Sequence, residues 1–123
     1  MIWRDYYKMS NFTIVISESP YGREKAYTAL RFALTSLIDE HNVNLFLVQD
    51  GVFVGLKEQA PQQYPNHFEL LENFVEEGGK LRICGVCINA RGISNSDLID
   101  GAEAVGMHDF VEWVAESDKV LMF

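Results

Sequence analysis

Short runs of apolar, often β-branched residues alternate along this chain with longer segments whose apolar residues recur every three or four positions. This alternation is the feature that most constrains the fold. Residues 12–17 and 43–48 are two such short runs, and they predict buried strands. Residues 23–40, between them, have the spacing that gives a helix one apolar face. A strand, a helix and a strand in this order predict a βαβ unit with parallel strands.

The middle of the chain is expected to continue the same pattern. Residues 50–66 are mixed in character and predict a long, partly ordered loop. A second helix is predicted to begin at Asn66, whose side chain can cap it while Glu69 follows three residues later, and to end at a pair of glycines. Residues 81–88 predict a third strand by composition, and residues 89–92 a turn after it.

The C-terminal part predicts four further elements. Residues 98–106 are expected to form a short helical turn and then a small strand. Residues 119–123 predict a final strand. Between them, residues 108–116 have helical spacing, and we expect three apolar side chains of this helix to face inward: Phe110, Val111 and Val114.

Together these elements predict an α/β fold. We expect a three-layer sandwich in which helices cover both faces of a mostly parallel sheet of four or five strands. A chain of 123 residues has the size of one domain, which we place at residues 12–123, after an N-terminal segment at residues 1–11. That segment is rich in aromatic residues, and we expect Trp3, Tyr6 and Tyr7 to cover a sheet edge or to lie in a subunit contact.

Charge and hydropathy exclude several classes of function. Ten basic residues stand against 18 acidic ones, a formal net charge of −8, so direct binding to nucleic acid is not expected. No apolar run approaches the roughly 18 residues of a membrane span, and the first residues lack the apolar centre of a signal peptide. We therefore expect no membrane association and a cytoplasmic location, where thiols stay reduced.

Two cysteines, Cys84 and Cys87, are the candidates for chemistry. On a straight strand their Cα atoms would lie roughly 10 Å apart and their side chains on opposite faces, whereas a disulfide needs Cα atoms within about 7 Å. Either the strand ends near Cys84 and Gly85 lets the chain turn, or the two thiols have separate roles. Arg91, and backbone N–H groups near Asn95, are candidates to stabilise a thiolate by lowering the pKa of a nearby thiol.

Other site chemistries have less support in the sequence. A single Cys-x-x-Cys motif with scattered histidines does not supply four zinc ligands, so we expect no metal. The first strand-to-helix turn, residues 17–23, is short enough to present backbone N–H groups to an anion, but it has neither dinucleotide-binding nor P-loop spacing. A free cysteine in an apolar strand is also most often a small buried side chain without chemistry.

Several short motifs, taken in order, resemble the DsrE/DsrF-like family of sulfur-relay proteins, which includes the TusD subunits of tRNA thiolation. The similarity extends from Phe12 to Phe123. The motifs that carry it are Ser19-Pro-Tyr-Gly22 before the long helix, Asp50-Gly-Val-Phe53 after the second strand, Cys84 seven residues before Arg91-Gly92, and the terminal Glu112-Trp113 and Asp118 to Phe123.

The resemblance implies a flavodoxin-like subunit that assembles into trimers or hexamers and needs no cofactor. It also implies a persulfide sulfurtransferase activity, with Cys84 at the position of the family's sulfur-carrying cysteine and with donor and acceptor proteins as partners. Cys87 departs from the TusD pattern. This second cysteine could resolve a persulfide into a disulfide and release sulfide, or it could itself be the reactive thiol.

Two alternatives from other classes remain open. The first is a noncatalytic oligomeric module that binds a small ligand in a crevice near Tyr21, Gly22, Gly51 and Asn89, with cysteines that only pack. The second is a dithiol redox protein, which requires Cys84 and Cys87 to lie within disulfide range.

Overall fold

The computed structural model describes residues 8–123. The expectations for Trp3, Tyr6 and Tyr7, and for most of the segment at residues 1–11, lie outside these residues. Within the described part of the chain, no helix is long and apolar enough to cross a membrane.

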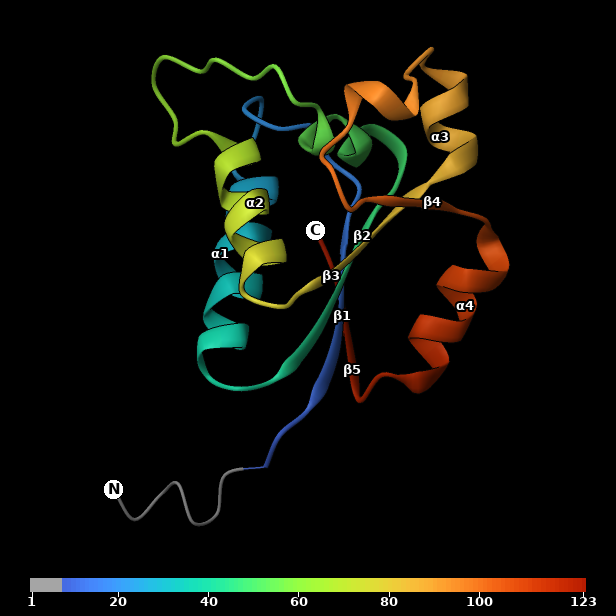
Figure 1. Ribbon diagram of the computed structural model, residues 1–123. Helices are drawn as coiled ribbons and strands as arrows, with labels where there is room; N and C mark the ends of the chain where they lie inside the picture. Colours follow the sequence, from blue (N-terminus) through green and yellow to red (C-terminus); the bar gives the residue numbers. More distant parts are fainter. Residues whose placement is uncertain (1–7) are drawn as a thin grey trace.

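A five-stranded sheet, parallel throughout, forms the centre of the molecule (Figure 1). The strand order is β4-β3-β2-β1-β5, so the chain builds the sheet outward from β1 in one direction and places the last strand on the other side of β1. This arrangement confirms the predicted parallel α/β sheet. The strands are β1 (Asn11–Ile16), β2 (Asn42–Leu47), β3 (Lys80–Cys84), β4 (Glu103–Val105) and β5 (Lys119–Met122).

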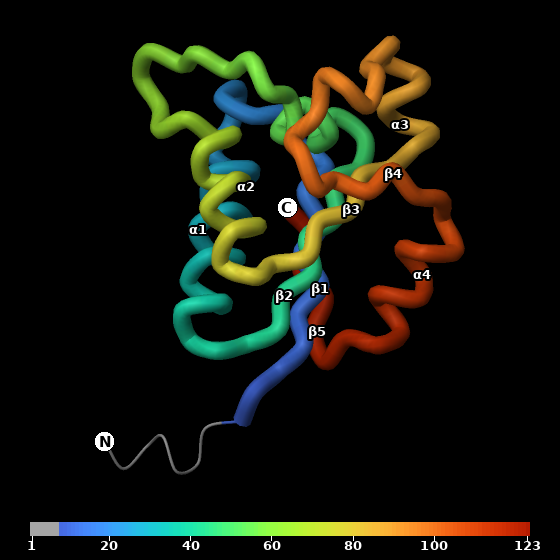
Figure 2. Tube along the Cα trace, viewed as in Figure 1, coloured from blue at the N-terminus to red at the C-terminus, as the bar shows by residue number. Residues whose placement is uncertain are grey.

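Helices lie on both faces of the sheet, which confirms the three-layer sandwich. Helices α1 (Lys25–Ile38) and α2 (His67–Glu76) pack against each other on one face, and α4 (Met107–Glu116) covers the other (Figures 1 and 2). The short helix α3 (Gly85–Ala90) follows β3 directly, and its Ile88 and Cys87 side chains pack against the larger core (Figure 1). The fold is flavodoxin-like.

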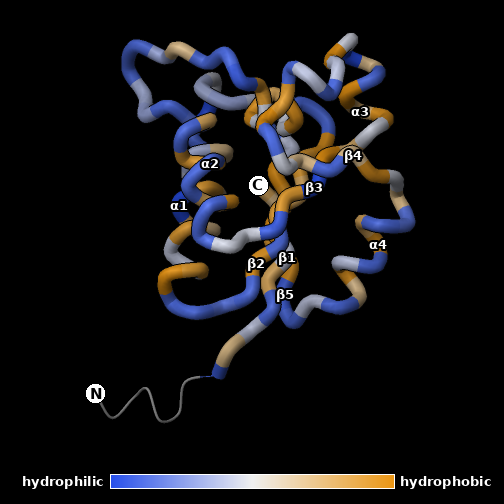
Figure 3. Tube along the Cα trace, viewed as in Figure 1, coloured by the Kyte–Doolittle hydropathy of each residue, from blue (hydrophilic) through white to orange (hydrophobic). Residues whose placement is uncertain are grey.

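The larger hydrophobic core lies between the sheet and the α1–α2 layer. Alternate strand residues point into it, and Ile14, Leu45 and Ile83 have no exposed surface. The opposite face has a smaller cluster around Phe46 and Trp113. Figure 3 shows the resulting concentration of hydrophobic residues along the strands. Of the described helices, only α4 covers the second face, so the hydrophobic core on that side of the sheet is the smaller of the two.

The predicted start of α2 is confirmed in detail. The Asn66 side chain accepts a hydrogen bond from the Glu69 N–H at 3.2 Å and so caps the helix. After the helix, Gly78 adopts φ +97°, a left-handed conformation that glycine takes without steric cost. Local capping signals therefore fix both ends of this helix.

The segment expected as a loop at residues 50–66 is partly helical, which corrects the prediction. A 3₁₀ helix, η2 (Gln49–Gly55), follows β2, and its Val52 and Val54 side chains are completely buried. The helix was missed because its seven residues are too few to show a helical period. Burial of the two valines anchors η2 to the core.

The predicted strand at residues 81–88 is also wrong in its second half. Strand β3 ends at Cys84, and residues 85–90 are helical. Of the turn predicted at residues 89–92, the first two residues end this helix, and Arg91 and Gly92 form the turn, with Gly92 at φ +67°. A short apolar run has no period that separates strand from helix, so composition alone extended the strand too far.

The inward face of α4 differs from the predicted one. Phe110 is partly buried and stacks on Phe46 with ring centroids 4.2 Å apart, as expected, but Trp113 is the residue that is buried. Val111 is 59% exposed and Val114 37% exposed, so both face outward. The helix is rotated relative to the prediction because its largest aromatic side chain occupies the position against the sheet.

Candidate functional site

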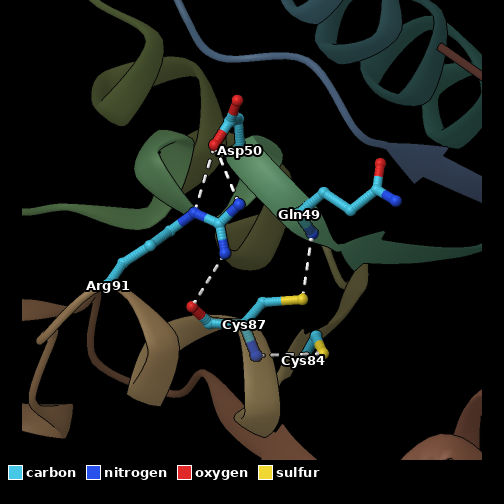
Figure 4. Close-up of polar contacts among 5 residues, drawn as sticks. All are labelled: Gln49, Asp50, Cys84, Cys87 and Arg91. Atoms are coloured by element: carbon cyan, nitrogen blue, oxygen red, sulfur yellow. Dashed lines mark hydrogen bonds and ion pairs between the residues drawn. The ribbon is translucent and has the colours of Figure 1, made fainter.

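The two cysteines lie where the carboxyl ends of β2 and β3 meet, the edge at which open parallel sheets place their chemistry. The register pairs Leu47 with Ile83, so the residues that follow β2 lie beside those that follow β3. Helix η2 begins at the first end and α3 at the second. Figure 4 shows the five residues that this arrangement brings together: Gln49, Asp50, Cys84, Cys87 and Arg91.

Cys84 is the N-cap residue of α3. Its backbone is extended, and its Sγ accepts a hydrogen bond from the Cys87 N–H at 3.3 Å. Burial raises the pKa of the Cys84 thiol, and the neighbouring Cys87 side chain raises it further, although the backbone N–H groups of Cys87 and Val86 act in the opposite direction. Cys84 also packs against the Phe46 cluster, which explains its poor solvation.

Cys87 lies in the first turn of α3, and its sulfur points toward η2 (Figure 4). The Sγ accepts a hydrogen bond from the Gln49 N–H at 3.1 Å. Gln49 has φ +54°, a left-handed conformation that is uncommon for a residue with a side chain. Such conformations persist only where the surrounding structure holds them. The Gln49 N–H that donates to the Cys87 sulfur therefore belongs to a constrained segment.

Arg91 holds α3 against η2. Its Nε and Nη2 donate to Asp50 Oδ1 at 3.1 and 2.9 Å, and its Nη1 donates to the Cys87 carbonyl oxygen at 3.1 Å (Figure 4). All three of these groups donate to oxygen atoms, so Arg91 positions α3 against η2, and stabilisation of a thiolate by its charge stays a prediction. Asp50 is 60% exposed, and an ion pair of this kind contributes only about 0–1 kcal/mol to stability.

The helical conformation removes the geometric objection to a bond between the two sulfurs. Both cysteines are free thiols. Cys84 caps the helix that contains Cys87 and its Sγ contacts the Cys87 N–H, so the chain turns between the two residues and does not hold their Cα atoms roughly 10 Å apart as a straight strand would. The Cys87 N–H that touches the Cys84 sulfur is also only three covalent bonds from the Cys87 sulfur. The dithiol chemistry left open by the sequence is therefore sterically allowed.

Tyr21, from the predicted crevice, lines a cavity of about 570 Å³ on the other side of η2. Its hydroxyl donates to Gln59 Oε1 and accepts from the His67 N–H at 3.0 Å. Burial raises the pKa of Tyr21, and burial lowers the pKa of the enclosed His67 imidazole. The lining residues are Pro20, Tyr21, Phe53, Leu56 and residues 58–64.

The other predicted crevice residues do not line this cavity. Gly22 is exposed next to Tyr21. Gly51 is buried, and a Cβ atom there would lie 1.9 Å from the Ile16 carbonyl oxygen, so this glycine permits close packing of η2 on β1. Asn89 is exposed on α3. The structure therefore places the four residues at separate positions around η2.

Gln49 and Asp50 are site residues that the sequence reasoning did not assign a role. Asp50 belongs to the Asp-Gly-Val-Phe motif, and both residues follow a predicted strand directly. The signal that could have found them is topological, because the carboxyl ends of adjacent parallel strands lie at one edge of the sheet. Residues 8–123 contain no cluster of three or more histidine, cysteine or acidic side chains able to hold a metal ion.

The fold and the site together define a flavodoxin-like α/β protein with a thiol pair at the carboxyl edge of its sheet. The chain belongs to the DsrE/DsrF-like family, whose model matches residues 10–123. This match confirms the resemblance drawn from the sequence motifs.

Individual relatives agree with this assignment. An uncharacterized protein of Methanopyrus kandleri is 55% identical over 111 residues, which cover 90% of this chain and 92% of that protein. The crystal structure of the YchN protein from Escherichia coli superposes with a TM-score of 0.88 at 34% identity, covering 94% of this chain and 100% of that one. A protein of Vibrio vulnificus named as a sulfurtransferase TusD homolog is 27% identical over 128 residues, covering 91% of this chain and 96% of that protein. Membership of this family and the names of such relatives suggest a role in sulfur relay.

Proposed function

We propose that this protein is a sulfur carrier, which takes sulfane sulfur from the persulfide of a donor protein onto the Cys84–Cys87 pair and passes it to an acceptor thiol. The observation that carries the proposal is that both sulfur atoms belong to half-buried side chains at the carboxyl edge of the sheet and that each accepts a backbone N–H hydrogen bond. Such donors stabilise the thiolate, which is the form of cysteine that attacks sulfur.

The transfer is a thiol–disulfide type of exchange. A cysteine thiolate of this chain attacks the outer sulfur of the donor persulfide. A new sulfur–sulfur bond forms, the donor's sulfur–sulfur bond breaks, and the donor leaves as a thiolate. The acceptor thiolate then attacks the same outer sulfur and regenerates the cysteine. Neither step requires a cofactor or an outside oxidant, and both require reduced thiols, which fits a cytoplasmic location.

The partners in this proposal include further copies of the chain. Met107, Val111 and Val114 lie at positions i, i+4 and i+7 of α4 and form an outward apolar stripe with exposures of 67%, 59% and 37%. On the same sheet face, Val120 and Met122 of the edge strand β5 are 43% and 67% exposed. Apolar surface of this extent on one face favours a subunit contact, and we propose a homotrimer or homohexamer.

The experiment is direct transfer of sulfur to the reduced protein. Reduced protein is mixed with one equivalent of glutathione persulfide, samples are quenched with iodoacetamide at successive times, and each is weighed by intact-mass spectrometry. At early times we expect a gain of one sulfur atom, sensitive to dithiothreitol and cyanide, in the wild type and none in the double variant Cys84→Ser, Cys87→Ser. If the wild type carries no added sulfur at any time, or the double variant takes up as much, the sulfur-carrier proposal is wrong.

The cavity beside Tyr21 supports one competing function, a module that binds a small ligand. A volume of about 570 Å³ lies within the usual range of ligand sites, and Tyr21, Gln59 and His67 form a hydrogen-bonded wall near it. In this case, chemical shifts of Tyr21 and Leu56 should respond to a fragment library in the double cysteine variant. The variant Leu56→Trp, which fills the cavity, should abolish that response.

A further inference from the structure

The two thiols have different surroundings, although only two residues separate them. The Cys87 sulfur points across to η2 and meets the Gln49 N–H. The Cys84 sulfur lies at the start of its own helix, where it accepts the Cys87 N–H and contacts the apolar cluster of Phe46. Both side chains are half-buried, since Cys87 packs against the larger core. They differ in the source of the donor, because the N–H at the Cys87 sulfur comes from a separate constrained segment and the N–H at the Cys84 sulfur comes from α3 itself. Two thiols in such different positions are suited to different steps.

We propose that Cys87 is the thiol that takes up sulfur and that Cys84 is a resolving thiol, so that the loaded protein releases hydrogen sulfide when no acceptor arrives. This inference rests on the proposed sulfur-carrier function and deepens it by assigning a step to each cysteine. It adds a second activity, the reduction of sulfane sulfur to sulfide by the dithiol.

In the first step the Cys87 thiolate attacks the outer sulfur of the donor persulfide. The bond from Cys87 Sγ to that sulfur forms, the donor's sulfur–sulfur bond breaks, and the donor leaves as a thiolate. In the second step the Cys84 thiol loses its proton to solvent and its sulfur attacks Cys87 Sγ. The bond between the two Sγ atoms forms, the outer sulfur leaves as hydrosulfide, and hydrosulfide and the released proton make up hydrogen sulfide.

The electrons balance within the chain. The two thiols are oxidised to a disulfide, and the sulfane sulfur gains the two electrons as sulfide. One turnover therefore needs no outside oxidant or reductant, and a second turnover needs a dithiol reductant to reopen the disulfide. Cys84 is placed for the second step, because its sulfur already lies 3.3 Å from the backbone nitrogen of Cys87, an atom three bonds from Cys87 Sγ.

The protonation state of the Cys84 thiol is also consistent with this order of attack. The raised pKa of Cys84 keeps this side chain mostly as the thiol near neutral pH, which slows its attack on Cys87 Sγ. The persulfide on Cys87 then survives long enough for an acceptor to take its outer sulfur. Resolution removes sulfur only from protein that has found no acceptor.

The test uses the full chain and single cysteine variants with glutathione persulfide as the donor. Reduced protein is mixed with one equivalent of the persulfide, and adduct mass, intramolecular disulfide and free sulfide are followed with time. The double serine variant provides the background of sulfide from the donor alone. Cys84→Ser is the informative variant, because serine is a good N-cap residue and preserves the start of α3; Cys84→Ala and circular dichroism control for folding.

We expect the wild type to pass through the adduct to a disulfide and to release one sulfide per chain. Cys84→Ser should keep the adduct and lose sulfide release, and Cys87→Ser should lose the adduct. If Cys87→Ser takes up sulfur as fast as the wild type, or Cys84→Ser releases sulfide as the wild type does, the assignment of steps is wrong while the sulfur carrier stands. If the wild type gains no sulfur at all, the proposed function fails and this assignment with it.

Discussion

The backbone N–H of Gln49 donates a hydrogen bond to the Sγ of Cys87 at 3.1 Å, across the gap between the ends of two neighbouring strands. The contact depends on the left-handed backbone of Gln49, with φ +54°. Because Gln49 is the first residue of η2, the conformation of this helix affects the reactivity of the Cys87 thiol on α3.

Substituting Gln49 tests this connection. Gln49→Val places a β-branched side chain in the left-handed region, where such residues are more strongly disfavoured than glutamine, and so displaces the amide. We expect slower alkylation of Cys87 by iodoacetamide, measured in a Cys84→Ser background. Gln49→Gly retains both the N–H and the conformation and is the matched control. Equal rates in all three proteins would show that the amide does not affect the sulfur.

Breaking the ion pair between Asp50 and Arg91 should distinguish its effect on the position of α3 from its effect on the stability of the protein. Because the pair is partly exposed, we expect Asp50→Asn to lower the free energy of unfolding by less than about 1 kcal/mol. The same change loosens α3 against η2 and should slow sulfur uptake measurably. Urea denaturation and the rate of adduct formation provide the two measurements. A large loss of stability, or an unchanged uptake rate, would contradict the positioning role of the pair.

The rate of sulfide release should depend on pH through Cys84. Its pKa is raised in the folded protein, so at neutral pH the attacking thiolate is a minor form. Below that pKa the thiolate fraction rises about tenfold per pH unit, and sulfide release from preloaded protein should rise in the same proportion. The rate is expected to level off only above the ordinary range for a cysteine. A pH-independent rate between pH values of about 6 and 9 would exclude Cys84 as the attacking group.

A charge on the outer stripe of α4 should weaken the proposed oligomer without unfolding the chain. Val111 is 59% exposed in the single chain, so Val111→Lys should change the stability of the subunit by no more than about 0.5 kcal/mol. We expect a lower molar mass by sedimentation equilibrium. Met9→Lys, at a residue that is 57% exposed on another part of the surface, is the control. An oligomer unaffected by Val111→Lys would place the subunit contact elsewhere.

The two glycines assigned to the predicted crevice should respond differently to alanine. In Gly51→Ala the new Cβ would lie 1.9 Å from the Ile16 carbonyl oxygen, so η2 must move, and we expect a loss of about 1–3 kcal/mol in unfolding free energy. Gly22→Ala meets no atom closer than the Ser19 hydroxyl at 3.8 Å and should be tolerated. Urea denaturation of both variants decides whether Gly51 has a structural role.

Local signals explain why much of the fold could be predicted from the sequence. The cap at Asn66 and the apolar runs of β1 and β2 determine structure within a few residues of their own positions, and the structure confirms them. The rotation of α4 could not be predicted in this way, because the buried position of Trp113 depends on its contact with Arg82 of β3, whose guanidinium carbon lies 4.4 Å from the ring centroid.

The candidate site was predictable only in part for the same reason. Cys84, Cys87 and Arg91 could be selected by residue type and position, but their geometry depends on where β3 stops. That stop coincides with the pairing of Cys84 with Val105 of β4, a strand distant in sequence. The left-handed Gln49 had no sequence signal, because glutamine is not a residue that favours this conformation.

Helix η2 separates two regions of different chemistry, with Gln49 and Asp50 facing the thiols and Phe53 lining the cavity beside Tyr21. Seven residues therefore set the geometry on both sides. What keeps them in place is the complete burial of Val52 and Val54. Trimming either valine to alanine would create a void beneath the segment and let it shift, so the speed of the sulfur chemistry should be sensitive to the packing of two methyl-bearing side chains that take no part in it.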